Sequence, residues 1–242
     1  MLLEIAVFNI QSAIQAQQSG ADRIELCDNP SDGGTTSSYG TLKTMREKVS
    51  IPVFPIIRPR GGDFLYSDDE FAVMKKDILL CKQLGFEGAV IGLLNKDGSI
   101  DTTRTSQLVE IAYPLEITFH RAFDRCKEPL QSLEDIISCG CQRILTSGQM
   151  PNAYNGKELI EQLVQQADDR IIIMPGSGVR HNNIAELAAY TGAAEFHSSA
   201  RKTVATKMSF TNANMNEMLE NILVDEDEIK KMKQFLLAAV LE

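Results

Sequence analysis

The chain has 242 residues, of which 43% are hydrophobic and 24% charged, as is ordinary for a folded, soluble protein with a large core. Its net charge of −9 argues against a nucleic-acid partner, because binding to a phosphate backbone needs a basic face. No apolar run approaches the roughly 18 residues that span a bilayer, and the first ten residues lack the basic start of a signal peptide. We therefore expect a cytoplasmic protein without a membrane partner.

Short apolar runs alternate with longer helical patterns along the chain, which is typical of βαβ units that build a parallel sheet. We expect eight strands, at 2–7, 23–26, 53–57, 89–93, 116–119, 143–145, 171–174 and 195–197. Helices are expected at 10–19, 41–48, 68–84, 103–112, 129–139, 156–167 and 182–190, with a last helix at about 225–241.

Eight strand and helix pairs in this length favour a closed (β/α)8 TIM barrel with parallel strands over an open doubly wound sheet. No GxGxxG follows the first strand, which further disfavours a dinucleotide-binding fold. No linker divides the chain, so residues 1–242 are expected to form a single domain. The stretch 199–221 is poorly periodic, and we expect a long loop or a broken helix there.

Polar side chains cluster where the fifth expected strand ends. His120, Arg121 and Asp124 follow the apolar run 117–119. Because barrel enzymes keep their chemistry at the C-terminal ends of the strands, His120 and Asp124 are candidate catalytic residues. The alternative is that His120 and Arg121 only pair with carboxylates at the rim of the barrel, since structural ion pairs also occur at such places.

The segments after the last two strands are typical of an anion site. Glycines at 176 and 178 and the His-Ser pair at 197–198 lie where barrels commonly bind phosphate through backbone amides. Three arginines at the same rim would add guanidinium groups that suit phosphate or carboxylate. The candidate substrate-binding residues are Arg58, Arg60, Asp63, Arg121, Ser147, Gly176, Gly178, His197 and Ser198. The alternative is a rim of structural ion pairs.

Two carboxylates lie inside otherwise apolar strands, at Glu4 and Glu25. A buried carboxylate is costly unless it is paired, so each should meet an Arg or a His inside the mouth of the barrel. Glu25 with His120 or Arg58 would form a general acid/base pair, which makes Glu25 a third candidate catalytic residue. The alternative is a buried structural salt bridge.

The five cysteines are scattered through the chain without the pattern of a secreted disulfide framework, so we expect reduced thiols. Side chains that suit Cu(I) occur at Cys139, Cys141, Met208, Met215 and Met218. Cys139 and Cys141 are expected at the opposite end of the barrel, and the Met spacing is typical of a packed helix face. A set on one rim would be Cys27, Cys126, His120 and His197, although its spacing resembles no standard zinc finger.

Four motifs carry a resemblance to a known family: GADRIELC at 20–27, IRPRGGDF at 57–64, TFHRAFD at 118–124 and LTSG at 145–148. With these runs the sequence resembles the CutC family, named as copper homeostasis proteins. The resemblance implies a TIM barrel, a cytoplasmic location, self-association into a homo-oligomer and a role in copper tolerance or trafficking. Cys27 lies inside a matching motif and is the metal ligand that a copper-binding role would imply.

Three functional interpretations remain open. The first is a CutC-like protein of copper homeostasis that binds copper through Cys27, His120 or neighbouring residues. The second is an enzyme for a small phosphorylated or carboxylate metabolite, with Glu25 or His120 as acid/base and the arginines as anion ligands. The third is an inert barrel used for assembly, in which the charges at the rim pair with one another.

Overall fold

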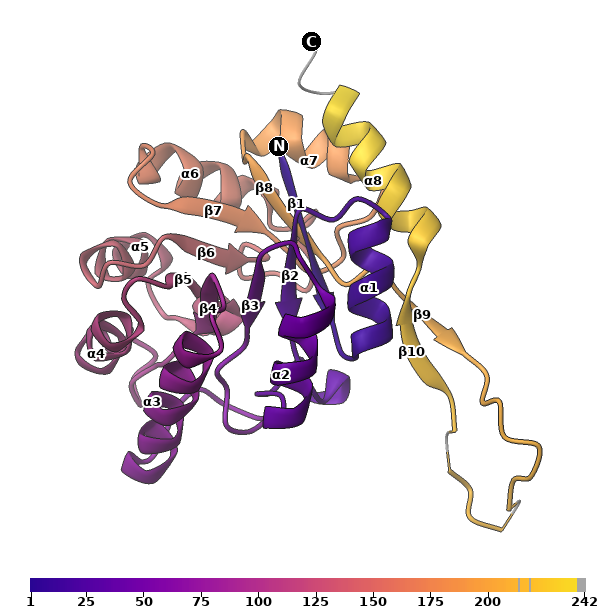
Figure 1. Cartoon of the computed structure of the whole chain (residues 1–242). Coiled ribbons are helices and arrows are strands. Elements are labelled where there is room, and N and C mark those ends of the chain that lie inside the picture. The colour runs from indigo at the N-terminus through magenta and orange to yellow at the C-terminus, as the bar shows by residue number, and fades with distance from the viewer. Residues whose placement is uncertain (213, 218, 239–242) are drawn as a thin grey trace.

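The structure is a computed structural model that describes residues 1–212, 214–217 and 219–238. Eight parallel strands surround the centre, and Figure 1 shows the helices around them. The strands are β1 (Leu2–Val7), β2 (Arg23–Leu26), β3 (Val53–Pro55), β4 (Gly88–Ile91), β5 (Glu116–Phe119), β6 (Arg143–Thr146), β7 (Ile172–Pro175) and β8 (Glu195–Ser198). The expected strands all form, with shifts of one or two residues at several ends.

The helices follow the strands as expected. They are α1 (Ile10–Gln18), α2 (Tyr39–Lys48), α3 (Asp68–Gln83), α4 (Thr102–Ala112), α5 (Pro129–Ser138), α6 (Lys157–Ala167), α7 (Ile184–Thr191) and α8 (Glu226–Ala238). Residues 239–241 of the expected last helix lie outside the described residues. Among the helices that the structure describes, none is both long enough and apolar enough to cross a bilayer.

The strands form a TIM barrel, which confirms the expected fold. Hydrogen bonds join them in the orders β3-β2-β1-β8 and β4-β5-β6-β7. A parallel bridge between Ile56 and Val90 links the two sets, and the Ile57 amide donates to the Val90 carbonyl at 2.8 Å. On the other side, β7 lies beside β8 (Figure 1).

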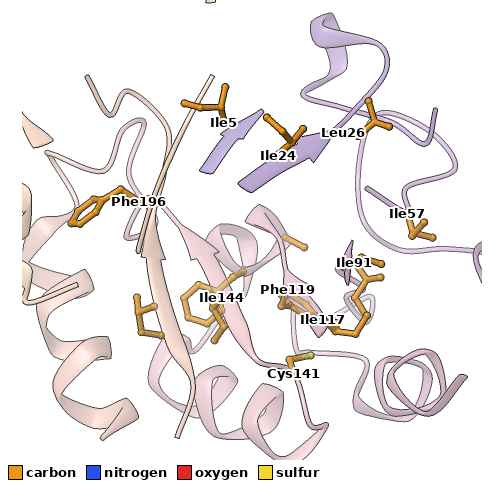
Figure 2. Packing of buried hydrophobic residues seen from close by; sticks show 14 of the residues in the cluster. Ile5, Ile24, Leu26, Ile57, Ile91, Ile117, Phe119, Cys141, Ile144 and Phe196 are labelled. Atoms are coloured by element: carbon orange, nitrogen blue, oxygen red, sulfur yellow. The ribbon is translucent and has the colours of Figure 1, made fainter. Parts of the chain in front are cut away.

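Alternation along the strands separates an apolar outer face from a polar inner face. Leu3 and Ile5 of β1, Ile24 of β2 and Phe196 of β8 belong to the main core between strands and helices, part of which is drawn in Figure 2. The residues between them therefore point into the barrel. These are Glu4, Arg23, Glu25, Glu195 and His197, and the register places Glu4 beside both Arg23 and His197.

A buried network of charged side chains from β1, β2, β6 and β8 lies inside the barrel. Arg23 pairs with Glu4 and, at 2.6 Å, with Glu195. Arg143 pairs with Glu195 at 3.1 Å, and both guanidinium groups lie about 5 Å from the centre of the Phe54 ring. The expectation that Glu4 would meet an Arg or a His inside the barrel is confirmed.

Several turns have the backbone geometry that their sequence predicts. Gly20, Gly85, Gly140 and Gly192 all have a φ between 70° and 95°. This left-handed conformation, which glycine adopts without a steric penalty, ends each helix before the next strand.

The stretch 199–221 corrects the sequence interpretation. Instead of only a loop or a broken helix, strand β9 (Arg201–Val204) pairs antiparallel with β10 (Asn221–Val224), and Thr203 lies opposite Ile222. The paired residues include several β-branched side chains, which favour extended backbone. Figure 1 shows that this ribbon extends away from the barrel.

Candidate functional site

A cavity of about 340 Å³ opens at the C-terminal ends of the barrel strands. This volume lies at the small end of the range for sites that bind small molecules. Side chains from β1, β2, β6 and β8 line the cavity, together with the segments that follow β2, β3, β5 and β7. The candidates from the sequence that reach it are Glu25, Cys27, Arg58, His120, Arg121, Gly178, His197 and Ser198.

Glu25 lines the cavity as part of a short chain of titratable groups. His197 Nδ1 donates to Glu4 Oε1 at 2.8 Å, and its Nε2 lies 3.6 Å from Glu25 Oε2. Glu4 is in turn held by Arg23. The sequence predicted His120 or Arg58 as the partner of Glu25; the nearest charged partner in the structure is instead His197, which the register of β8 on β1 brings between the two carboxylates.

The two carboxyl groups beside His197 have opposite pKa shifts. Burial raises the pKa of Glu25 to about 7, against an opposing effect of His197. Arg23 and His197 lower the pKa of Glu4 to about 2, although its burial acts in the opposite direction. Burial disfavours the charged imidazole, but the bond to Glu4 and the charge of Glu25 leave the pKa of His197 raised. Of the two carboxyl groups, Glu25 is therefore the one that can exchange a proton near neutral pH.

Arg58 is a buried guanidinium that interacts with backbone carbonyls instead of carboxylates. It is 5% exposed and donates to the carbonyls of Asp32, Gly34 and Gly62 at 2.6–3.0 Å. Within the part of the chain that the structure describes, no carboxylate pairs with it, and its Nε–H has no acceptor. The cavity therefore contains a positive charge without a protein counter-charge.

His120 is held in one orientation at the same wall of the cavity. Its Nδ1 accepts from the Ala122 amide at 3.1 Å, so the proton of the neutral ring is on Nε2. Burial and the charge of Arg58 lower its pKa to about 3. The ring fits only because residue 92 is glycine, since a Cβ there would lie 2.3 Å from the imidazole. No acceptor for Nε2 exists among the described residues.

The opposite wall, after β7 and β8, presents backbone amides. Those of Gly178, Val179 and Ser199 donate to no other residue in the described ranges, and all three residues line the cavity. Gly178 has a φ of 71°, and the Ser198 hydroxyl donates to the Val179 carbonyl at 2.7 Å. Gly176 does not itself line the cavity, but a Cβ there would collide with Leu145.

Arg60 and Asp63, which were expected to bind substrate, lie outside the cavity. Arg60 pairs with Asp63 at 2.9 Å and with Glu70, at the start of α3. These partners hold the loop after β3 against the helix. At this point the structure agrees with the alternative interpretation of a rim ion pair.

Asp124, predicted to be catalytic, organises a loop. It accepts from the hydroxyl of Thr146, the amide of Ser147 and the side chain of Arg121. Arg121 also donates to the Ser147 hydroxyl at 2.9 Å and keeps a half-exposed side chain at the edge of the cavity. Neither Asp124 nor Ser147 lines the cavity, so their contribution is to place Arg121.

Cys27 lines the cavity but lacks the partners of a metal ligand. Burial, with Glu25 beside it, raises the pKa of the thiol well above its usual value, so sulfur keeps its proton. Cys126 is buried near Gln149 and does not line the cavity. Nowhere in the described residues do three or more His, Cys, Asp or Glu side chains gather as a possible metal site. Met218, proposed above with other soft ligands, lies outside the described residues.

The sequence did not predict two arginines that line the cavity or a glycine that makes room for His120. Arg180 and Arg201 line it and form no ion pair with the residues that the structure describes. The position of Arg180, three residues after Ser177 in the loop that leaves β7, was a usable signal. Gly92 gave no signal, because the need for it arises only from the position of His120.

Comparisons with known proteins identify the family. The CutC family model matches residues 1–202. A family protein CutC from Chromobacterium violaceum is 52% identical over 209 residues, which cover 86% of this chain and 85% of that protein. A human relative, named copper homeostasis protein cutC homolog, is 48% identical and matches 88% of this chain and 78% of its own length.

Solved structures agree with the sequence relatives. The crystal structure of a CutC protein from Streptococcus agalactiae is 34% identical, with a TM-score of 0.78 over 82% of this chain and 98% of that chain. Phosphoribosylanthranilate isomerase from Thermotoga maritima has a TM-score of 0.61 over 98% of this chain and 100% of that chain. At 12% identity it shares the fold alone.

Proposed function

This chain belongs to the CutC family, and we propose that its barrel is an enzyme that transfers a proton within a small phosphorylated metabolite by general acid/base chemistry. The observation that carries the proposal is Glu25. It is a carboxyl group at the wall of a ligand-sized cavity, and burial raises its pKa to about 7. A general base is most effective when its pKa lies near the working pH.

The proposed step is a proton shift that conserves atoms and electrons. The Glu25 carboxylate takes a proton from a carbon or hydroxyl of the substrate, and the Glu25 carboxyl group then returns a proton to a neighbouring atom of the substrate. The proton can exchange with solvent while Glu25 holds it. Isomerisation of this kind needs no oxidant, reductant or second substrate. His197, fixed by its bond to Glu4, lies 3.6 Å from Glu25 and sets the electrostatic environment of the base.

The amides after β7 and β8 support the assignment of a phosphate group to the substrate. Gly178, Val179 and Ser199 line the cavity, and their N–H groups have no acceptor among the described residues. Arg180 adds a positive charge to the same lining. Backbone amides at these two loops are the usual phosphate ligands in barrels of this fold.

Inorganic phosphate is the probe for this assignment. In an NMR titration with phosphate we expect saturable shifts of the Gly178, Val179 and Ser199 amides, and sodium chloride of equal ionic strength should leave those amides unchanged. The wild-type protein should then exchange a carbon-bound proton of a phosphorylated sugar or acid with D2O, with phosphate as a competitor. Absence of the phosphate shifts at these amides would contradict the proposal.

Copper is the second candidate function, because relatives are named for copper homeostasis and Cys27 lines the cavity. The residues around Cys27 do not fit Cu(I), since its thiol keeps its proton and no other thiol or thioether lines the cavity among the described residues. Cytoplasmic location, which the sequence predicts, and self-association, which the family resemblance implies, stay predictions.

An anaerobic Cu(I) titration against a competing chelator tests the copper function directly. We expect Cys27→Ser and the wild type to give the same curve, because a thiol whose pKa is strongly raised is a poor ligand at neutral pH. Cys81→Ser is the matched control, a buried cysteine in α3 outside the cavity. Stoichiometric binding that disappears only in Cys27→Ser would make copper the ligand of this cavity.

A further inference from the structure

The cavity has anion donors on two opposite walls. One set follows β7 and β8 and consists of the Gly178, Val179 and Ser199 amides. The other set follows β3 and β5 and includes Arg58 and His120. In a closed barrel of eight strands, β3 and β7 are four strands apart and therefore face each other across a diameter of about 15 Å between backbones. Arg58 and the amides after β7 therefore start from opposite sides of the cavity.

The Arg58 wall lacks a negative charge. The guanidinium is 5% exposed, and the three carbonyls that bind it are neutral. A buried charge without a counter-ion is strongly unfavourable unless a ligand supplies one. The Nε–H of Arg58 is buried and has no acceptor in the described part of the chain, so one donor of the group is left without a partner.

His120 adds a second buried donor without a partner. Arg58 and His120 both contact the Phe64 ring, with the Arg58 Cζ 5.0 Å and the imidazole centre 4.9 Å from the ring centre. The ring of His120 is neutral with its proton on Nε2, which lacks an acceptor among the described residues. Two N–H donors in contact with the same Phe64 ring would suit the two oxygens of a carboxylate, one bond to each.

The geometry points to a substrate with an anionic group at each end, a phosphate held by the Gly178, Val179 and Ser199 amides and a carboxylate held by Arg58 and His120. Glu25 lies on β2, between these walls, where it reaches the carbon chain that joins the two groups. The inference rests on the proposed function and specifies its substrate class, a short-chain phosphorylated acid. The small cavity limits the chain to a few carbons.

A series of ω-phosphonoalkanoates of two to five carbons tests this class by calorimetry, with alkylphosphonates of equal length as partners that lack the carboxylate. For the wild type we expect the best phosphonoalkanoate to bind at least about tenfold tighter than its alkylphosphonate, as a charge-assisted hydrogen-bonded carboxylate should. Its binding should also shift the His120 Nε2–H resonance, which the alkylphosphonate leaves in place.

Arg58→Gln should abolish this tenfold advantage and keep the affinity for alkylphosphonate, which also shows that the cavity is folded. Arg60→Gln is the matched control, because Arg60 pairs with Asp63 and Glu70 outside the cavity, and it should keep the advantage. Equal affinities of the two compounds in the wild type, or an advantage that survives in Arg58→Gln, would overturn the inference. If alkylphosphonates fail to bind at all, the proposed function itself fails.

Discussion

Replacement of Glu25 by glutamine is expected to slow substrate proton exchange by about a thousandfold, the effect of removing a general base. Glutamine has nearly the same size and keeps the hydrogen-bonding groups, but it cannot accept the proton. Binding of alkylphosphonate should not change, because its ligands lie after β7 and β8. Exchange in D2O measured by NMR checks the rate, and calorimetry checks the binding.

The pH dependence of kcat/KM is a second test of Glu25 as the general base. Because the base must be ionised, kcat/KM of the wild type should fall about tenfold per unit below pH 7, near the raised pKa of Glu25. Glu158→Gln, an exposed carboxylate on α6, is the matched control and should retain both rate and profile. A Glu25→Gln variant with the rate of the wild type would eliminate Glu25 as the base.

The Glu25→Gln variant should be more stable to unfolding than the wild type in alkaline solution. The pKa of Glu25 is higher in the folded state, about 7, than its ordinary value of 4.5. The folded state therefore binds more protons between these values, and the stability that this confers is lost as the pH rises through 7. At pH 8 this loss is on the order of 2–3 kcal/mol, which glutamine avoids. Urea unfolding at pH 5 and pH 8 measures the difference.

Replacement of Arg23 by methionine is expected to lower the free energy of unfolding by about 3–5 kcal/mol. Arg23 is 3% exposed and pairs with Glu4 and Glu195, so its loss leaves two buried carboxylates with less compensation. Methionine keeps most of the side-chain volume. The loss of unfolding free energy therefore reports the removal of the charge and not the creation of a cavity. Urea denaturation at pH 7 is the measurement.

Lys127→Met is the matched control for Arg23. Lys127 pairs with Asp97, and both side chains are about half exposed, so water screens the interaction. Its loss should change the unfolding midpoint far less than the loss of Arg23. Equal effects of the two variants would show that the buried network adds no more stability than a surface ion pair.

The fold could be predicted from the sequence because strand-like apolar runs and helical patterns alternate regularly along the chain. Eight apolar runs, each separated by a helical pattern, predicted the barrel. The ribbon of β9 and β10 was missed because β9 is mostly exposed and β10 shows no alternation of buried and exposed residues, so neither strand has an apolar alternation to detect. Its pairing depends on two segments sixteen residues apart.

The site was readable only in part. The position of Glu25 in an apolar strand predicted a partner, but the identity of that partner depends on how β8 aligns with β1, which brings in His197. Arg58 and Arg60 look equivalent in the sequence. Two residues apart in a strand, their side chains would point to the same face. Both lie beyond the end of β3, however, and there Arg58 lines the cavity while Arg60 pairs with Glu70 outside it.

The contact between Gly92 and His120 links two segments that are far apart in the sequence. A Cβ at residue 92 would overlap the imidazole of His120. We therefore expect the residues at the two positions to vary together among homologues. A homologue that gains a side chain at the first position must give up or move the ring at the second. Relatives that have both Gly92 and His120 are therefore expected to retain this wall of the cavity. Relatives that lack the pair are expected to keep only the barrel, and the sequences alone distinguish the two groups.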